Sequence, residues 1–402
     1  MNFGAGQRQW VVISCVGVAQ ILAWGSSYYL TAVLAGPVVA DNGWPTAWIV
    51  GALSLGLLAS GLVSPRVGRL IHRYGGRMVL AASACLLGTG LLVVGLAPSL
   101  PVYIAGWVVV GIGMGCGKYD PAFSNLGRIY GEGAHSAITQ VTLFGGFAST
   151  VCWPLTALLV DQVGWRGACF AYAAIHAFVV LPLYLFGLPR EDQAPAGPAA
   201  TDGRQPGYVR PDQRAAFVLL AAGFTLASLI MTVISVHLLT LLQSRGIALA
   251  AAVGLGALLG PAQVSARIAE MAFGRKVHPV WSLLASSLLV AVGIAMLIGA
   301  PGVAAAGIIL YGSGSGIRSI ARGTVPLALF GQEGYSILMG RIAMPTLVAQ
   351  AASPTIGAWL LEDTGATTTL AVLCGAAILN IALVMALLPL ALRKPSGRVG
   401  RN

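Results

Sequence analysis

The chain has 402 residues, of which 57% are hydrophobic and only 9% are charged, and its mean hydropathy is +0.84. A soluble domain carries roughly 25% charged residues, so this composition excludes a soluble enzyme, a disordered chain and a coiled coil, and predicts a polytopic membrane protein. The formal net charge of +11 would suggest a nucleic-acid partner in a soluble domain. In a membrane protein, however, basic residues first of all report topology.

Twelve largely apolar runs are long enough to cross a bilayer as helices, which takes about 20 residues each. Transmembrane β-strands would instead alternate over about ten residues, so the continuous runs predict an all-α fold. The first run is long and lacks a small-residue cleavage site, which is typical of a retained helix. In chain order the predicted spans are 10–34, 46–65, 78–97, 102–126, 137–160, 168–188, 215–241, 248–272, 280–298, 303–328, 337–361 and 368–392.

The basic residues predict the orientation. Of the 23 Lys and Arg residues, 17 fall on the side that holds both termini, whereas the opposite connections hold only Arg166 and Arg245. Cytoplasmic loops collect positive charge, so we expect both termini in the cytoplasm and no nucleic-acid partner. The 17 residues are Arg8, Arg66, Arg69, Arg73, Arg77, Arg128, Arg190, Arg204, Arg210, Arg214, Arg267, Arg275, Lys276, Arg393, Lys394, Arg398 and Arg401.

The sequence offers no enzyme, cofactor or metal motif. All six cysteines lie within apolar runs without CxxC spacing, and buried Cys is often a small hydrophobe. Gly-x-Ser-x-Gly, HExxH and phosphate-binding Gly-rich Lys motifs are absent from positions where they could act. We therefore expect neither enzymatic activity nor a cofactor.

The only long polar stretch, residues 189–213, contains five prolines and is typical of a flexible cytoplasmic linker. It separates an N-terminal six-helix bundle (1–188) from a C-terminal one with a short basic tail (214–402). The two halves repeat each other, and duplicated bundles are a transporter architecture with the binding site between them. The repeated features are Gly111, Gly113 and Gly115 with Gly312, Gly314 and Gly316, Trp153-Pro154 with Ser353-Pro354, Asp161 and Gly164 with Glu362 and Gly365, and 68–77 with 266–276.

Three local motifs carry a family resemblance. The loop after the second span has Gly68, Arg73, Gly75 and Arg77 at the spacing of a G-x-x-x-D-R-x-G-R-R signature, and its further motifs are Gly164-Trp165-Arg166 and DNGWPTAW (41–48). Over its whole length the chain resembles a major facilitator superfamily transporter. DNGWPTAW is similar to the monocarboxylate-porter and oxalate/formate-antiporter branches. The resemblance implies alternating access, a monomer, and a central cavity lined by helices 1, 4, 7 and 10.

The chain departs from the family's patterns in several places. His72 replaces the signature's acid, although the second copy of the loop carries Glu270. In the family this acid latches the two halves on the cytoplasmic side, so a His could make gating depend on pH; the alternative is a relaxed loop residue. The expected gating residues are His72, Arg73, Arg77, Glu270 and Arg341, the last with structural pairing between the bundles as its main role.

The branch-specific motifs are also incomplete. Trp107 stands where drug exporters have an Arg in helix four, and Gly145-Gly146 with Trp153-Pro154 match their helix-five motif only in part. The Arg-Pro of monocarboxylate porters is missing from helix eight, near Ala262 and Gln263. These losses lower the expectation of proton-driven drug export without selecting another branch.

Four cations remain inside or near the predicted spans, namely Lys118, Arg318, Arg322 and Arg341. Charges at membrane depth are costly and point to function. The repeat places Lys118 and Arg318 at equal depth, where they could bind a carboxylate from opposite sides of the cavity, with Arg able to hold it through two bonds. The alternative is that both extend to lipid headgroups. Arg322, one turn further on, is expected to be an interface anchor.

Helices one and seven supply further candidates for the substrate site. Gln20, Trp24 and Tyr28 share one face of helix one, and Tyr29 is adjacent. A hydroxyl stripe in helix seven includes Thr232 and Ser235, which face either the cavity or a neighbouring helix. Aromatic residues near a membrane interface are also common anchors, so that reading stays open for Tyr29.

Two residues are candidates for proton coupling. Asp120 lies beside cations at partial depth and could titrate, or it could simply neutralise Lys118. His237 could act as a proton switch, although a lone His, like His176 in helix six, is more often a satisfied hydrogen-bonding group. Pro121 frees a backbone carbonyl and could kink helix four.

These features predict a secondary transporter that moves a small organic anion by alternating access, with protons as the coupling ion and a lipid bilayer as its surroundings. The alternatives are an efflux transporter for amphipathic metabolites or drugs, and a membrane receptor that has lost transport. The linker is too short for an ATPase domain. The abundance of Arg over Lys and of Ala and Gly suggests a GC-rich bacterium and its inner membrane.

Overall fold

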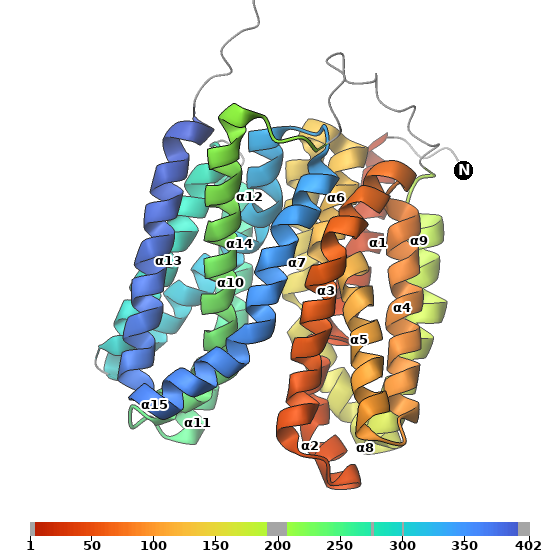
Figure 1. Ribbon diagram of the computed structural model, residues 1–402, viewed down its shortest axis with the longest axis vertical. Coiled ribbons are helices and arrows are strands. Elements are labelled where there is room, and N and C mark those ends of the chain that lie inside the picture. Colours follow the sequence, from red (N-terminus) through yellow and green to blue (C-terminus); the bar gives the residue numbers. More distant parts are fainter. Residues whose placement is uncertain (1–4, 191–206, 275–276, 300, 393–402) are drawn as a thin grey trace, which may run out of the picture.

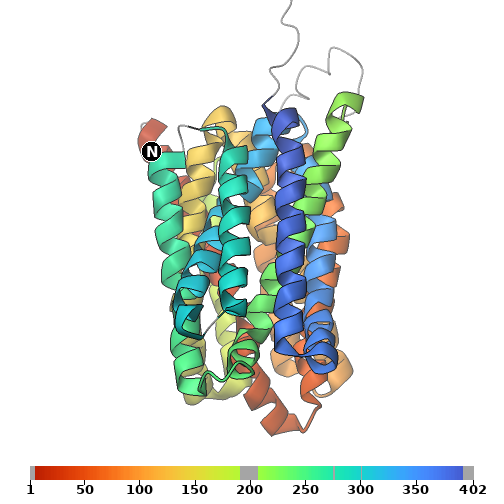
Figure 2. The same cartoon turned by 90° about the vertical axis from the view of Figure 1, so that its left-hand side faces the viewer.

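The computed structural model describes residues 5–190, 207–274, 277–299 and 301–392, and every regular element in these ranges is helical. Most of the expected linker, including Arg204, lies outside the described residues, as do Arg275, Lys276, Arg393, Lys394, Arg398 and Arg401. In both views the helices run close to parallel along the long axis of the molecule (Figure 1 and Figure 2).

The first half of the chain contains nine α-helices. They are α1 (Ala5–Gly25), α2 (Leu30–Asn42), α3 (Thr46–Tyr74), α4 (Gly76–Leu96), α5 (Leu100–Gly117), α6 (Tyr119–Tyr130), α7 (Ala134–Gly146), α8 (Ala148–Ile175) and α9 (Leu181–Gly187). A 3₁₀ turn, Gly131–Gly133, precedes α7, and a π-helical turn, His176–Val180, joins α8 to α9.

The second half contains six α-helices and two 3₁₀ turns. The helices are α10 (Arg214–Gln243), α11 (Leu249–Ala257), α12 (Leu259–Phe273), α13 (Pro279–Ile298), α14 (Ala304–Phe330) and α15 (Tyr335–Ala391). The 3₁₀ turns, Pro211–Gln213 and Pro301–Val303, precede α10 and α14.

Nine helical stretches in the described residues are long and apolar enough to cross a membrane. Two of them fold back at a glycine: α8 breaks at Gly164 (φ 72°) and α15 at Gly365 (φ 80°), a conformation that only glycine adopts readily. Figure 1 shows α15 running down and turning back up at the lower end of the view. Each break falls between two predicted spans, and α14 matches a further predicted span without being among the nine.

Four spans predicted as single helices are interrupted, and this corrects the sequence-based expectation. Residues 26–29 separate α1 from α2, Lys118 separates α5 from α6, Phe147 separates α7 from α8, and Leu258 separates α11 from α12. Hydropathy averaged over a run does not register a break of one to four residues. Local groups do: the Ser27 hydroxyl, for example, donates to the Ala23 carbonyl at the first break and so competes with the helix backbone.

Apolar packing differs between the halves. Two buried clusters consist only of residues from α10 to α15. The two large clusters of the first half also take in residues from the beginning of α15, namely Tyr335, Met339, Ala343 and Leu347. The first limb of α15 therefore packs into both halves.

Glycine allows α3 and α15 to approach closely. A Cβ atom at Gly68 would lie 2.3 Å from the Ser336 carbonyl oxygen, and one at Gly340 would lie 2.4 Å from the Ser64 carbonyl oxygen. Small residues at such crossings are typical of helix packing in membranes. The two halves thus meet backbone to backbone beside the region that contains Asp120.

Candidate functional site

Lys118 occupies the break between α5 and α6, with an extended backbone (φ −80°, ψ −161°). Its side chain is only 6% exposed. The ammonium nitrogen lies 4.0 Å from the centroid of the Trp24 ring and 5.2 Å from that of Tyr28. In the described part of the chain no carboxylate forms an ion pair with Lys118. Its charge is therefore stabilised by aromatic faces.

The same break explains the placement of Gln20. Pro121 has no N–H, so the Gly117 carbonyl lacks its usual helical donor four residues later. The Gln20 side-chain amide supplies it, with Nε2 2.7 Å from the Gly117 oxygen. Gln20 is fully buried. The side-chain nitrogen of Gln20, a residue expected to contact substrate, thus completes the hydrogen bonding of the α5–α6 segment.

Four aromatic rings cluster around Trp24 on one side of the Lys118 ammonium. The Trp24 ring centroid lies 5.7 Å from that of Tyr28, 6.2 Å from that of Tyr29 and 5.2 Å from that of Tyr119. Tyr119 was not a sequence candidate, although it directly follows Lys118. We use "aromatic wall" for these four rings.

Arg318 is the buried cation of the second half. It is 7% exposed, and its Nε and Nη2 atoms have no hydrogen-bond partner in the described residues. Tyr311, seven residues earlier in α14, interacts electrostatically with both Arg318 and Tyr28. Tyr311 therefore lies near both the cation of the second half and one ring of the aromatic wall.

The hydroxyl stripe of α10 contributes to the same region. Thr232 is buried and lies next to the Tyr28 hydroxyl. Ser235 lies next to Tyr311, whose own hydroxyl donates to the Met231 carbonyl at 3.3 Å. Side chains from α1, from the breaks that follow α1 and α5, from α10 and from α14 thus lie in one region of the structure.

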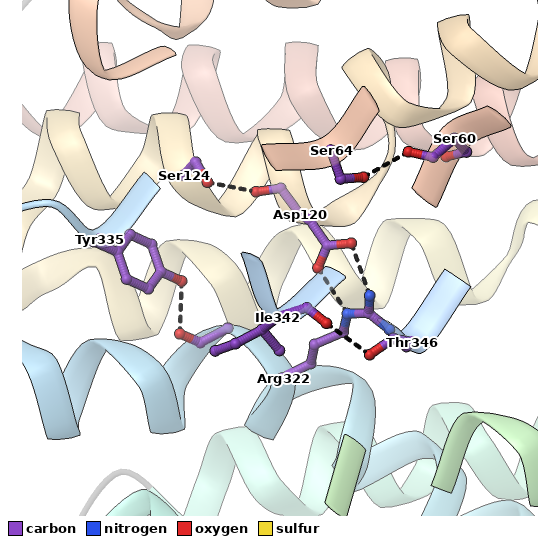
Figure 3. A network of polar contacts seen from close by, with 9 residues as sticks. Ser60, Ser64, Asp120, Ser124, Arg322, Tyr335, Ile342 and Thr346 are labelled. Carbon is purple, nitrogen blue, oxygen red and sulfur yellow. Dashed lines mark hydrogen bonds and ion pairs between the residues drawn. The ribbon is translucent and has the colours of Figure 1, made fainter. Parts of the chain in front are cut away.

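One turn from these cations, an ion pair joins the two halves. The Arg322 Nε and Nη2 atoms donate to the two Asp120 carboxylate oxygens at 2.7 and 2.8 Å (Figure 3). Both side chains are 15% exposed. This corrects two expectations, because Asp120 does not pair with Lys118 and Arg322 is not a lipid-facing anchor. Ion-pair partners 202 residues apart cannot be found from local sequence.

Polar and small residues surround this pair, which we call the gate pair. Ser124 donates to the Asp120 backbone carbonyl at 2.7 Å, and the Tyr335 hydroxyl donates to the Gly323 carbonyl at 2.7 Å (Figure 3). A small pocket borders Asp120 between α3, α6 and α15. It is lined in part by Ser64, Gly68, Asp120, Ser124, Ser336 and Gly340.

The expected gating residues of the first half lie elsewhere. The His72 carbonyl accepts a hydrogen bond from Arg128 at 2.9 Å, and its ring is influenced by the charges of Arg128 and Glu333. Glu333 belongs to the second half, so a charge of that half acts on the His72 ring. Arg73 is exposed, and Arg77 donates to a backbone carbonyl of α9 within its own half.

The remaining expected gating and coupling residues form hydrogen bonds within the second half or with the linker. Glu270 accepts from the Ser282 hydroxyl at 2.6 Å and so joins α12 to α13. Arg341 donates to the Gly207 carbonyl at 2.9 Å and so contacts the segment that joins the two halves. His237 is 3.1 Å from a backbone carbonyl of α15, the contact of a satisfied histidine.

A further buried cation, Arg267 of α12, was assigned to a loop on sequence grounds. It is 5% exposed and crosses to the first half, where Nη1 donates to the Thr142 carbonyl at 3.0 Å. Nε donates to the Ser319 hydroxyl at 3.0 Å and Nη2 to the Gln263 side-chain oxygen at 3.4 Å. Arg267 lies within the predicted span 248–272, and this position could have indicated from the sequence that it is a cation at membrane depth.

Many apolar helices, internal duplication and buried charges at the contact between halves define a multi-pass membrane transport protein. Residues 16–317 match the family model of the Major Facilitator Superfamily. The chain belongs to this superfamily, and it is therefore a transporter and not an enzyme.

Sequence relatives and solved structures resemble the chain over most of its length. Monocarboxylate transporter 11 of Homo sapiens is 27% identical over 406 residues, covering 95% of this chain and 83% of that protein. The human organic anion transporter MFSD10 superposes with a TM-score of 0.73 at 17% identity, covering 95% of this chain and 100% of that one. The proton:xylose symporter XylE has a TM-score of 0.75 at 10% identity, covering 95% and 96%.

Proposed function

We propose that the chain is a secondary active transporter that moves a small, carboxylate-like organic anion by alternating access, with protons as the coupling ion. The observation that carries the proposal is the pair of buried cations, Lys118 and Arg318, one from each half. Neither has a carboxylate partner in the described residues. A buried charge without a counterion is costly, and a bound anion offsets that cost.

The stereochemistry of Arg318 supports a carboxylate. A guanidinium presents two parallel N–H groups to a carboxylate, and Arg318 has two nitrogens without partners, Nε and Nη2. The sequence relation to a monocarboxylate transporter supports the same substrate class. Lys118, held against the aromatic wall, supplies a second positive charge.

The gate pair provides the coupling step of the proposal. Protonation of Asp120 removes the negative charge that holds Arg322, and the two halves then separate on the cytoplasmic side. The glycine contacts of α3 with α15 and the gate pair support a cytoplasm-closed arrangement in this structure.

The topology belongs to the same proposal. Twelve spans form two bundles, residues 1–188 and 214–402, joined by the cytoplasmic linker 189–213, with both termini in the cytoplasm. The breaks at Gly164 and Gly365 support this count, because each divides a long helix between two predicted spans. The protein acts as a monomer in a bacterial inner membrane.

Uptake into proteoliposomes tests the function. The purified protein is screened by thermal shift against lactate, pyruvate, benzoate, oxalate and xylose, and stabilising compounds are then supplied as radiolabelled solutes with and without an inward proton gradient. We expect a carboxylate to be accumulated and the gradient to increase its uptake. Uptake of xylose alone would contradict the anion site, and gradient-independent uptake would contradict proton coupling.

Efflux of amphipathic metabolites is the second candidate, and the aromatic wall favours it. Oppositely oriented membrane vesicles distinguish the two directions, because an exporter accumulates substrate in inside-out vesicles. A receptor would bind a carboxylate in the thermal-shift assay without any flux.

A further inference from the structure

The arrangement of the aromatic wall depends on the break between α1 and α2. Trp24 lies in the last turn of α1, and Tyr28 and Tyr29 belong to the turn that leads into α2. The Tyr29 N–H donates to the Trp24 carbonyl at 3.1 Å, one residue further than in an α-helix. The directions of these rings are therefore set by the turn between α1 and α2.

Three side chains from outside helix one hold this region. Cys152 Sγ lies 3.6 Å from the Ile21 carbonyl and Trp153 Nε1 donates to the Tyr29 carbonyl at 3.3 Å. His176 makes the shortest contact, with Nε2 hydrogen-bonded to the Ser26 hydroxyl at 2.7 Å. Hydrogen bonds weaken with distance, so the His176 contact contributes most.

His176 is placed for this contact by an unusual backbone. It is the first residue of the π-helical turn His176–Val180, and such turns are frequent at functional sites. His176 and Ser26 are both fully buried. The His176 Nδ1 atom has no hydrogen-bond partner in the described residues, so the ring's contribution passes through Nε2 alone.

We propose that His176 is a positioning residue of the substrate site. Through Ser26 it fixes the break in helix one, and the break places the Trp24 and Tyr28 rings against the Lys118 ammonium. His176 itself does not touch substrate. The effect on transport rests on the proposed function, whereas the effect on Trp24 is independent of it.

The geometry predicts which residues can replace His176. A Gln side-chain amide reaches the position of Nε2, whereas an Asn amide reaches that of Nδ1. His176→Gln should therefore keep the hydrogen bond to Ser26, and His176→Asn should lose it. Ser26→Ala removes the same bond from the other side with little change in volume, and therefore tests the proposal even if His176→Asn does not fold.

Fluorine NMR of Trp24 tests the positioning directly. The protein is labelled with 5-fluorotryptophan, and the Trp24 signal is assigned with Trp24→Phe. We expect Ser26→Ala and His176→Asn to shift this signal and His176→Gln to keep it. An unchanged signal in Ser26→Ala, or equal shifts in His176→Asn and His176→Gln, would overturn the proposal. This readout needs no substrate, so it decides the inference even if no anion is transported.

Transport kinetics provide the second readout. Loss of a buried hydrogen bond to the positioned turn should raise the apparent KM about tenfold with little change in kcat, and His176→Gln should restore it. Thr156→Val is the matched control, because it removes buried hydrogen bonds to the Tyr172 hydroxyl (2.8 Å) and to the Cys152 carbonyl (2.6 Å) in the same half and leaves the bond between His176 and Ser26 in place. A KM change as large in Thr156→Val would reduce His176 to a general stabilising role and overturn the proposal.

Discussion

Two arginines one turn apart in α14 have opposite surroundings. Arg322 forms two hydrogen bonds with the Asp120 carboxylate of the other half. Arg318 is buried, yet two of its nitrogens have no partner in the described residues. The first half shows the same contrast over two residues, since Lys118 faces aromatic rings while Asp120 is paired. Charges that are satisfied within the protein can hold the halves together, whereas unsatisfied ones are available to a ligand.

Because of this contrast, replacing an unsatisfied cation should lower transport and raise stability, whereas breaking the pair of Asp120 and Arg322 should lower stability. Replacing a buried charge that lacks a counterion removes a desolvation cost, whereas removing one partner of a buried pair leaves the other uncompensated. Substitutions of Arg318 and Arg322 should therefore distinguish the proposed substrate region, through transport, from the gate pair, through stability.

The largest expected effect is on transport in Arg318→Met. Losing two charge-assisted hydrogen bonds to the substrate, worth roughly 3 kcal/mol together, should slow uptake about 100-fold. Proteoliposome flux of the carboxylate measures it, with Arg210→Met as the exposed control. Normal uptake by a folded Arg318→Met protein would exclude the anion site.

The next effect is on stability in Arg322→Met. It should lower the free energy of unfolding by about 3 kcal/mol, because Asp120 is left buried and unpaired. Thermal unfolding in detergent and hydrogen exchange of α6 and α14 measure it. The exchanged pair Asp120→Arg with Arg322→Asp should recover part of the loss, and equal stability of all three proteins would show that the gate pair does not hold the halves together.

A smaller effect is expected at the glycine contact beside the gate. Gly340→Ala would place a Cβ 2.4 Å from the Ser64 carbonyl oxygen, so α3 and α15 must separate at a cost of about 2 kcal/mol. Gly375→Ala in the same helix meets nothing within 4 Å and should instead stabilise by about 0.5–1 kcal/mol. Unfolding curves that shift in the same direction for both variants would contradict the close approach.

The smallest effect is expected in Lys118→Met. Without substrate, relief of the buried charge should outweigh the lost contact with Trp24 and raise the free energy of unfolding by about 1 kcal/mol. Thermal unfolding without ligand measures it, and the same variant should lose stabilisation by carboxylates. A destabilised Lys118→Met protein would show that the aromatic wall alone satisfies this charge.

Hydropathy was sufficient to find long apolar helices. Nine helical stretches of the described residues are long and apolar enough to cross a membrane, and they overlap predicted spans, because a bilayer requires both apolar composition and a minimum length. The helix breaks were not predicted, since they depend on single residues such as Lys118. Pro121 was the one local sign, and it indicated a free carbonyl without revealing that Gln20 would occupy it.

The candidate site was predictable in part. Trp24 and Tyr28 lie against Lys118 and Thr232 lies next to Tyr28, whereas the role of these residues and of Arg318 in binding substrate stays a prediction. Contacts across the halves were not predictable, because they depend on how the helices pack. Arg267 illustrates this: the repeat aligned residues 266–276 with a loop, and its partner Thr142 lies 125 residues earlier.

The bond between Gln20 and Gly117 has a mechanical consequence. The Gly117 carbonyl of α5 accepts its hydrogen bond from Gln20 of α1. It therefore has a donor only while α1 and the α5–α6 segment keep their relative position. Bending of the α5–α6 segment at Lys118 must then either move α1 as well or break the hydrogen bond between Gln20 and Gly117. During a transport cycle α1 and the α5–α6 segment should therefore move together, with a hinge at Lys118, and the aromatic wall should move with them.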